Sequence, residues 1–263
     1  MTPWEIAAGG AAGFVAGAVN ALAGGGTLVS FPVLVAIGLP PVAANITNTV
    51  ALSPGYLGGA LSQRAEAATQ RQRIRRLALV AAAGGLLGSI LLVLTSDDAF
   101  RNLIPALILF ATLLLAGQER LRARLQRNHP NGETDSDGGP APRHDPAWLA
   151  VPVLLVSIYG GYFGAGLGIM LLAVLGILLP DPLPRLNALK QVLAFVINVT
   201  AALFFLTSGK VYWAIALVMA ITSLAGGAAG GRVAGSVKPE VLRAIVVVIG
   251  LSVSVVYAIR YWF

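Results

Sequence analysis

Long apolar stretches alternate with short polar segments along the whole chain. Most of them have about the 20 residues that a helix needs to cross a hydrocarbon core of roughly 30 Å. The first and the fifth are much longer than one crossing requires. The stretches lie at residues 5–37, 42–63, 77–95, 100–117, 148–179, 186–207, 212–234 and 241–262. This pattern predicts an all-α polytopic membrane protein.

Both of the longest stretches contain a glycine cluster near their middle. The first reads AGGGT and the fifth reads SIYGGYFGAGLGIML. Unpaired backbone groups at membrane depth cost several kcal/mol each, so such a break has to be buried in protein or face a polar cavity. We expect each stretch to form a glycine-broken or re-entrant helical hairpin, with a substrate cavity at the breaks. The break residues are Gly24, Gly25, Gly26, Thr27, Gly164, Gly166 and Gly168.

The two halves of the chain are related by one offset of 142 residues, which pairs Asn45 with Asn187 and Arg101 with Arg243. The same offset pairs glycines of the two breaks without any gap. It predicts an internal duplication, with two pseudo-symmetric repeats that each consist of a hairpin followed by three transmembrane helices. The expected domains are a first transmembrane repeat at 1–117, a linker at 118–147 and a second transmembrane repeat at 148–263.

The positions of Lys and Arg predict how the two repeats are oriented, because these residues accumulate in cytoplasmic loops. If each long stretch crosses the membrane once, the repeats are parallel; if each folds back as a hairpin, they are inverted. The inverted arrangement leaves fewer basic residues outside. We therefore expect inverted repeats, with both termini outside and the Gly-, Pro-, Asp- and Ser-rich linker in the cytoplasm.

The composition agrees with a membrane protein, since 57% of the residues are hydrophobic and only 11% are charged. The net charge of +7 is explained by the cytoplasmic excess of Lys and Arg, so no nucleic-acid partner is expected. The absence of cysteine excludes disulfides and thiol chemistry. His129 and His144 both lie in the linker without metal-ligand spacing, so no metal site is expected. No Lys or Arg precedes the first apolar stretch, which argues against a cleaved signal peptide.

The distribution of carboxylates excludes several functions. No Asp or Glu lies well inside an apolar stretch. Proton pumps, cation channels and metal transporters usually need buried acids or histidines, so these classes are disfavoured. Hydrolytic catalysis is disfavoured as well, because no serine has a histidine or carboxylate base at the same membrane depth. Neither an enzyme nor a cofactor is expected.

Lys190, in NALKQVLAFVINV, is the ionisable residue that lies well inside an apolar stretch. Such a residue is functional by default, although a lysine near a segment start can also snorkel to the interface. The offset pairs it with Asn48, so the polar residues of the two segments are expected to face each other. Donors dominate this set, which suits an oxyanion; the alternative for its Asn and Thr residues is hydrogen bonding between helices. The set consists of Asn45, Thr47, Asn48, Thr49, Asn187, Lys190 and Gln191.

Two segments carry a resemblance to a known family. GFVAGAVNALAGGGTLVSFPVLVAIGLPPVAANITNT resembles the opening motif of the sulfite exporter TauE/SafE family, and SGKVYWAIALVMAITSLAGGAAGGRVAGSVKPEVLR resembles its closing motif. The similarity spans nearly the whole chain. It implies a multi-pass transporter of sulfite or organosulfonate-type anions in the bacterial inner membrane. The second half departs from the pattern, with GAGLG where many members have three consecutive glycines.

The sequence therefore predicts a transporter that exports sulfite, an organosulfonate or a similar small oxyanion through a donor-rich midplane site between the repeats. The expected partners are this anion and the lipid bilayer, and a homodimer is compatible with the sequence. Two alternatives stay open: a non-transporting scaffold or receptor, and a carrier for a cation or a neutral metabolite. The glycine breaks favour transport, because a scaffold needs no re-entrant backbone at the midplane.

Overall fold

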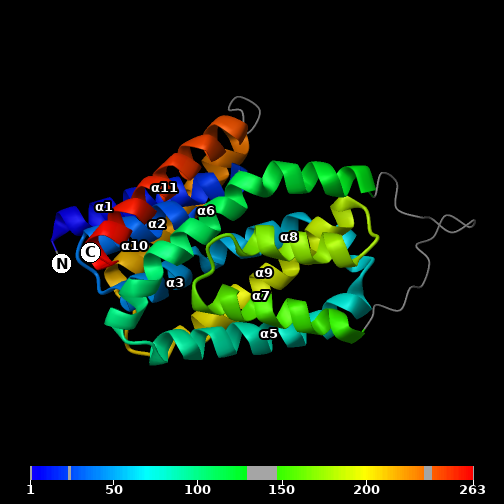
Figure 1. Cartoon of the computed structure of the whole chain (residues 1–263), viewed down its shortest axis with the longest axis horizontal. Coiled ribbons are helices and arrows are strands. Elements are labelled where there is room, and N and C mark those ends of the chain that lie inside the picture. Colours follow the sequence, from blue (N-terminus) through cyan, green and yellow to red (C-terminus); the bar gives the residue numbers. More distant parts are fainter. Residues whose placement is uncertain (1, 23–24, 129–146, 234–238, 263) are drawn as a thin grey trace, which may run out of the picture.

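The computed structural model describes residues 2–22, 25–128, 147–233 and 239–262, and every regular element among them is a helix (Figure 1). The first half contains α1 (Pro3–Leu22), α2 (Thr27–Ala36), α3 (Pro41–Ser62), α4 (Arg64–Ala68), α5 (Arg71–Leu94) and α6 (Asp97–Asn128). The second half contains the short 3-10 helix η1 (Ala147–Leu149), α7 (Ala150–Tyr162), α8 (Leu167–Leu178), α9 (Leu183–Leu206), α10 (Trp213–Val233) and α11 (Pro239–Trp262).

The two longest apolar stretches are each broken into a helical hairpin, as the sequence predicts. In the first, α1 is followed by α2, and the two helices pack against each other; in the second, α7 packs against α8 in the same way. Gly25, Gly164 and Gly166 have φ values of 92°, 77° and 75°. Only glycine adopts this left-handed region without steric cost, which explains the glycines at both breaks. Gly24 lies outside the described residues.

The helices that are long and apolar enough to cross a bilayer include α5, α6, α9, α10 and α11. The hairpin helices α2, α7 and α8 are shorter, with 10, 13 and 12 residues. At about 1.5 Å per residue each of them reaches only about halfway across the hydrocarbon core. Because α7 and α8 are both too short to cross the core singly, we expect the glycine break between them to lie at membrane depth. The chain is thus an all-α, multi-pass membrane protein.

Each half packs its helices against helices of the other half. α1 packs against α10 of the other half, and α7 packs in the corresponding way against α5. α3 and α9 form a pair, as do α6 and α11. α6 and α11 run antiparallel, because Trp262 at the end of α11 donates to the carbonyl of Asn102 near the start of α6, and Arg243 near the start of α11 pairs with Glu119.

Helix starts repeat at the offset found in the sequence. α3 and α5 begin at residues 41 and 71, and α9 and α10 begin 142 residues later, at 183 and 213. Antiparallel pairing of corresponding helices is the geometry that inverted repeats require. The common origin of the two halves, and which end of the bundle faces the cytoplasm, stay predictions.

Close packing of α5 on α7, and of α10 on α1, depends on glycines where the helices touch. A Cβ atom added at Gly88 of α5 would overlap the backbone carbonyl of Ile158 in α7. A Cβ atom at Gly226 of α10 would overlap the carbonyl of Phe14 in α1 in the same manner. Small residues allow membrane helices to approach until their backbones touch, so these positions set the spacing of both helix pairs.

The two chain ends lie at one end of the bundle, and the last turns of α6 lie at the other (Figure 1). These turns are rich in exposed arginines, among them Arg120, Arg124 and Arg127. Around the bundle, large apolar side chains such as Leu217, Val248 and Val255 are exposed and form the surface that faces lipid. α6 continues through Asn128, so the expected linker begins as helix; its residues 129–146 lie outside the described part.

Candidate functional site

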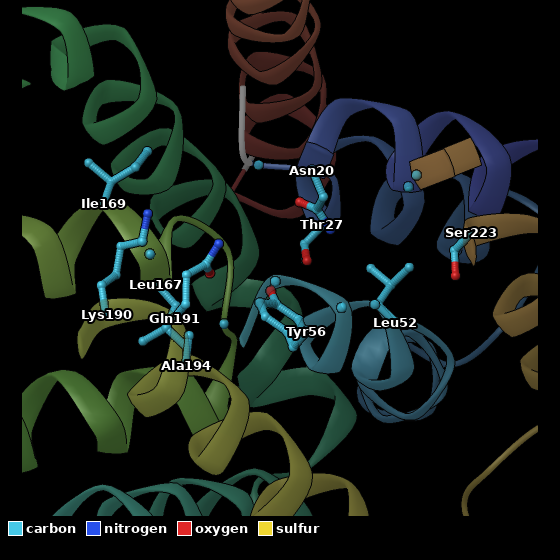
Figure 2. A pocket seen from close by; sticks show the side chains of 18 of the residues that line it. Asn20, Thr27, Leu52, Tyr56, Leu167, Ile169, Lys190, Gln191, Ala194 and Ser223 are labelled. Carbon is cyan, nitrogen blue, oxygen red and sulfur yellow. The ribbon is translucent and has the colours of Figure 1, made fainter. Parts of the chain in front are cut away.

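A cavity of about 710 Å³ lies between the two hairpins. Its wall includes residues from α1, α2, α3, α6, α8, α9 and α10, so both halves contribute. Figure 2 shows Lys190 and Gln191 together on one side, Asn20 and Thr27 on another, and Tyr56 between the two groups. The predicted site residues that line it are Gly25, Thr27, Gly164, Gly166, Gly168, Lys190 and Gln191.

The cavity occupies one end of the bundle. Its α3 residues all belong to the second half of that helix, and it extends as far as Ser62 and Gln63. Its α9 residues belong to the beginning of α9, which lies beside the end of α3, since Gly59 approaches the Gln191 side chain. Gln118 of α6 completes this side. The cavity therefore leads from the glycine breaks toward the end of the bundle that is predicted to be cytoplasmic.

An aromatic cluster fills the space on the opposite side of the breaks. It consists of Phe31, Phe100, Tyr162 and Phe163, whose rings meet edge to face. The rings of Phe31 and Phe163, one from each hairpin, are 5.4 Å apart between centroids, and both side chains are buried. Each aromatic pair stabilises the packing by about 0.5–1.5 kcal/mol beyond its buried area. Phe100 lies near the start of α6, whereas the cavity residue Gln118 lies in the second half of that helix, so the cluster and the cavity mouth lie toward opposite ends of the bundle.

Lys190 is the one charged residue among the described residues that line the cavity. Its ammonium group donates a hydrogen bond of 3.1 Å to Oδ1 of Asn187, one turn earlier on α9. An ammonium group has three N–H donors, so this bond leaves two for a ligand. No carboxylate among these lining residues neutralises the lysine. A half-buried cation without a counter-charge favours an anionic ligand.

The beginning of α8 forms the cavity wall beside Lys190. Gly166 caps the helix in the left-handed conformation, and no side chain hydrogen-bonds to the cap. A Cβ atom built at Gly168 would lie 3.9 Å from Cδ of Lys190. The N–H groups of Leu167 and Ile169 already donate to the carbonyls of Gly164 and Gly166, so within this turn the N–H of Gly168 is the one left without a backbone acceptor among the described residues. A helix N-terminus attracts anions, and a glycine lets a ligand approach it closely.

At the first break, one backbone N–H group is already paired with a side chain. Oδ1 of Asn20 accepts a 2.7 Å hydrogen bond from the N–H of Gly26, at the start of α2. A Cβ atom at Gly26 would overlap the carbonyl of Ala16, so Gly26 is needed for packing on α1 and does not line the cavity. The N–H of Gly26 is therefore already paired, and the charged donor of the cavity wall, Lys190, lies beside the second break.

The predicted polar residues of α3 are used in contacts between helices and do not line the cavity. Nδ2 of Asn45 donates to the carbonyl of Tyr162 at 2.8 Å, and Oγ1 of Thr47 accepts from the N–H of Tyr212 at 3.1 Å. Asn48 accepts from Ser30, at 2.5 Å. All three α3 side chains are buried. The sequence left two roles open for these side chains, binding of an anion and hydrogen bonding between helices. This geometry corresponds to hydrogen bonding between helices.

Two further predicted residues lie next to the cavity wall. Asn187 is half-buried and holds the Lys190 ammonium group, so it acts on the cavity through Lys190. Thr49 is half-buried, and its backbone carbonyl accepts a 2.6 Å hydrogen bond from Ser53. Neither residue lines the cavity.

Sequence reasoning missed several polar residues of the wall, namely Asn20, Tyr56, Ser62, Gln63, Gln118 and Ser223. Asn20 could have been found, because it is the last polar residue before the first glycine break. Gln118 was assigned to the linker, since the apolar stretch ends before it. The helix continues through that position and carries Gln118 into the cavity.

The chain has recognisable relatives. It is 27% identical over 245 residues to a probable membrane transporter protein of Haemophilus influenzae, which covers 92% of this chain and 90% of the relative. It is 25% identical over 250 residues to the probable membrane transporter protein ORF9 of a Sinorhizobium species, covering 93% and 88% of the two chains. The probable membrane transporter protein YfcA of Escherichia coli K12 is 24% identical over 247 residues, covering 91% and 84%.

No solved structure matches the chain significantly. The family described as sulfite exporter TauE/SafE matches residues 9–257, which include both glycine breaks, Lys190 and the whole cavity wall. The chain belongs to the sulfite exporter TauE/SafE family.

Proposed function

We propose that this protein is a membrane transporter that exports sulfite, an organosulfonate or a similar small oxyanion. The observation that carries the proposal is the cavity at the glycine breaks, which contains Lys190 and, among its described residues, no carboxylate. Membership of the TauE/SafE family and the resemblance to probable membrane transporters support transport as the activity.

In the proposed site the anion binds between Lys190 and the first turn of α8. Lys190 supplies a full positive charge, and the backbone N–H of Gly168 at the start of α8 supplies a further donor. A helix N-terminus stabilises an anion by about 0.3–1 kcal/mol at a surface and by up to about 2 kcal/mol where it is partly buried. Asn187 orients the lysine by accepting one of its hydrogen bonds.

Transport requires that this site be exposed alternately to the two sides of the membrane. In the described conformation the cavity leads to one end of the bundle, and in the proposed mechanism the aromatic cluster closes the path to the other. Because Phe31 and Phe163 belong to different hairpins, a tilt of one hairpin against the other would separate their rings. We propose that this movement opens the second pathway while the cavity closes.

The experiment that tests the proposal is a flux screen with the purified protein in proteoliposomes. Sulfite, sulfate, sulfoacetate, taurine and thiosulfate are supplied one at a time, and exchange of labelled for unlabelled anion is measured. Saturable exchange of at least one anion, absent from protein-free liposomes, is the expected result. Exchange of taurine alone would indicate a carrier for neutral or zwitterionic metabolites, and exchange of none would favour the scaffold or receptor.

A further inference from the structure

One face of α6 continues past the cavity toward the end of the bundle. Gln118, Arg122 and Leu125 are spaced four and three residues apart, so they lie on the same side of the helix. Gln118 lines the cavity. Leu125 is buried, and its side chain occupies the space that a Cβ atom at Gly176 of α8 would take. Arg122 therefore lies between a cavity residue and a contact with α8, on the face of α6 that borders the cavity.

The charge of Arg122 is not compensated in the described part of the chain. Arg122 is exposed and makes no ion pair there, whereas Arg185 and Arg243 are each paired with a carboxylate. The nearest acid on α6, Glu119, is taken by Arg243 at 2.6 Å. Arg122 thus places a positive charge that is unpaired among the described residues one turn of α6 away from the cavity residue Gln118.

Gln118 adds an unsatisfied polar atom one turn from this charge. Its Oε1 is buried and has no hydrogen-bond partner among the described residues. Rotation of the amide can present either its oxygen or its NH2 group at this place, and each needs a partner. With the NH2 group turned inward, Gln118 would donate to an anion that is held by Arg122.

We propose that Arg122 and Gln118 form an outer anion subsite at the mouth of the cavity, where oxyanions are captured before they reach Lys190. This subsite rests on the proposed function and takes the same class of ligand. It acts on capture by long-range attraction, which concentrates anions at the mouth and speeds their association. It has no part in the later step that moves the anion from Lys190 across the membrane.

The expected effect of losing the Arg122 charge is a weaker capture that depends on salt. In Arg122→Gln the half-saturating concentration for labelled sulfite in the exchange assay should rise about threefold to fivefold at about 20 mM ionic strength. The difference should become small at about 300 mM, because the Debye length falls well below 10 Å. The maximal exchange rate should stay unchanged, and Arg122→Lys should restore most of the affinity.

Arg124→Gln is the matched control, because Arg124 is exposed on the same helix but points to another side. It should leave the half-saturating concentration unchanged. An equal shift in both variants, or a shift in Arg122→Gln that ignores salt, would overturn the subsite. If the wild-type protein exchanges sulfite but Arg122→Gln matches it at both salt concentrations, the subsite fails alone. If the wild-type protein exchanges no anion, the proposed function fails with it.

Discussion

Nδ2 of Asn45 in α3 donates a 2.8 Å hydrogen bond to the backbone carbonyl of Tyr162, the last residue of α7. The bond satisfies one of the carbonyls that every helix leaves free at its end. One turn further along α3, Asn48 accepts from Ser30 and lies 3.5 Å from Oγ1 of Thr27, both in α2. A single helix of the first half thus holds both broken hairpins at successive turns.

Asn45→Ala should lower stability and leave anion affinity unchanged. The substitution removes the donor from a buried carbonyl, which costs about 1–3 kcal/mol. The measurement is the unfolding temperature of the detergent-solubilised protein, together with the half-saturating concentration in the exchange assay. Thr49→Ala is the control, because no side-chain hydrogen bond of Thr49 is found among the described residues. A weaker affinity with unchanged stability would instead make Asn45 a ligand.

The same two asparagines show where sequence reasoning reached its limit. The glycine breaks, the hairpins and the helical spans follow from composition and spacing, because unpaired backbone in a membrane leaves few alternatives. The direction of one side chain does not follow. Asn45 and Asn48 correspond to Asn187 and Lys190 at the offset of 142 residues, yet Lys190 points into the cavity and Asn48 into α2. Ser30 and Thr27 offer Asn48 polar partners, whereas the positions equivalent to them in the second half are Leu172 and Ile169.

Lys190→Ala should reduce anion exchange about tenfold or more, because a charged hydrogen bond to the substrate contributes about 1.5–3 kcal/mol. Lys190→Arg should be impaired as well, since the planar guanidinium group is larger and donates with a different geometry. Lys210→Ala is the control. Lys210 lies away from the cavity, where its ammonium group donates to the carbonyl of Val93. Full exchange by Lys190→Ala would mean that Lys190 only snorkels to the interface.

Gly88→Ala and Gly226→Ala should each destabilise the protein by about 1–3 kcal/mol, because the added methyl group overlaps a backbone carbonyl of the neighbouring helix. Gly117→Ala in α6 is the control, since nothing lies within 4 Å of its added Cβ atom. Because alanine loses less backbone freedom than glycine when a helix forms, this variant should be up to about 1 kcal/mol more stable. Each of the three variants is heated in detergent, and the size-exclusion peak of the folded protein that remains at each temperature is measured. Equal behaviour of the three variants would contradict backbone contact at Gly88 and Gly226.

The predicted topology can be tested with single cysteines, because the native chain has none. Trp4 in the first turn of α1 and Arg127 in the last turn of α6 are both exposed. The N-terminal end of α1 and the last turns of α6 lie at opposite ends of the bundle (Figure 1). In spheroplasts, a membrane-impermeant maleimide should label Trp4→Cys at once and Arg127→Cys only after permeabilisation. A reporter fused after Phe263 should likewise be active on the periplasmic side. Labelling of Arg127→Cys in intact spheroplasts, or a cytoplasmic reporter, would reverse the assigned orientation and the side to which the cavity leads.

Export should be driven by the membrane potential, because the single positive charge in the cavity can bind an anion but cannot neutralise a divalent one. Lys190 is the single charge among the described lining residues, so the complex with a divalent oxyanion remains negative and carries charge across the membrane. Moving one negative charge out of a cell that is negative inside is favourable by about 2.3 kcal/mol per 100 mV, and two charges double this to about 4.6 kcal/mol. At about 1.4 kcal/mol per tenfold ratio, the potential alone could sustain a gradient of roughly three decades.

Among the described residues, the buried carboxylate that could take part in proton coupling is Asp181, which does not line the cavity. Asp181 is paired with Arg73 at 2.5 Å and with Arg185 at 3.3 Å. In proteoliposomes, anion flux should therefore follow a potential imposed with potassium and valinomycin. It should ignore an imposed pH or sodium gradient once the protonation of the substrate is held constant. Flux that follows the proton gradient at zero potential would defeat this mechanism. Asp181→Asn would then be the first variant to examine, because loss of proton-driven flux in it would identify Asp181 as the coupling residue.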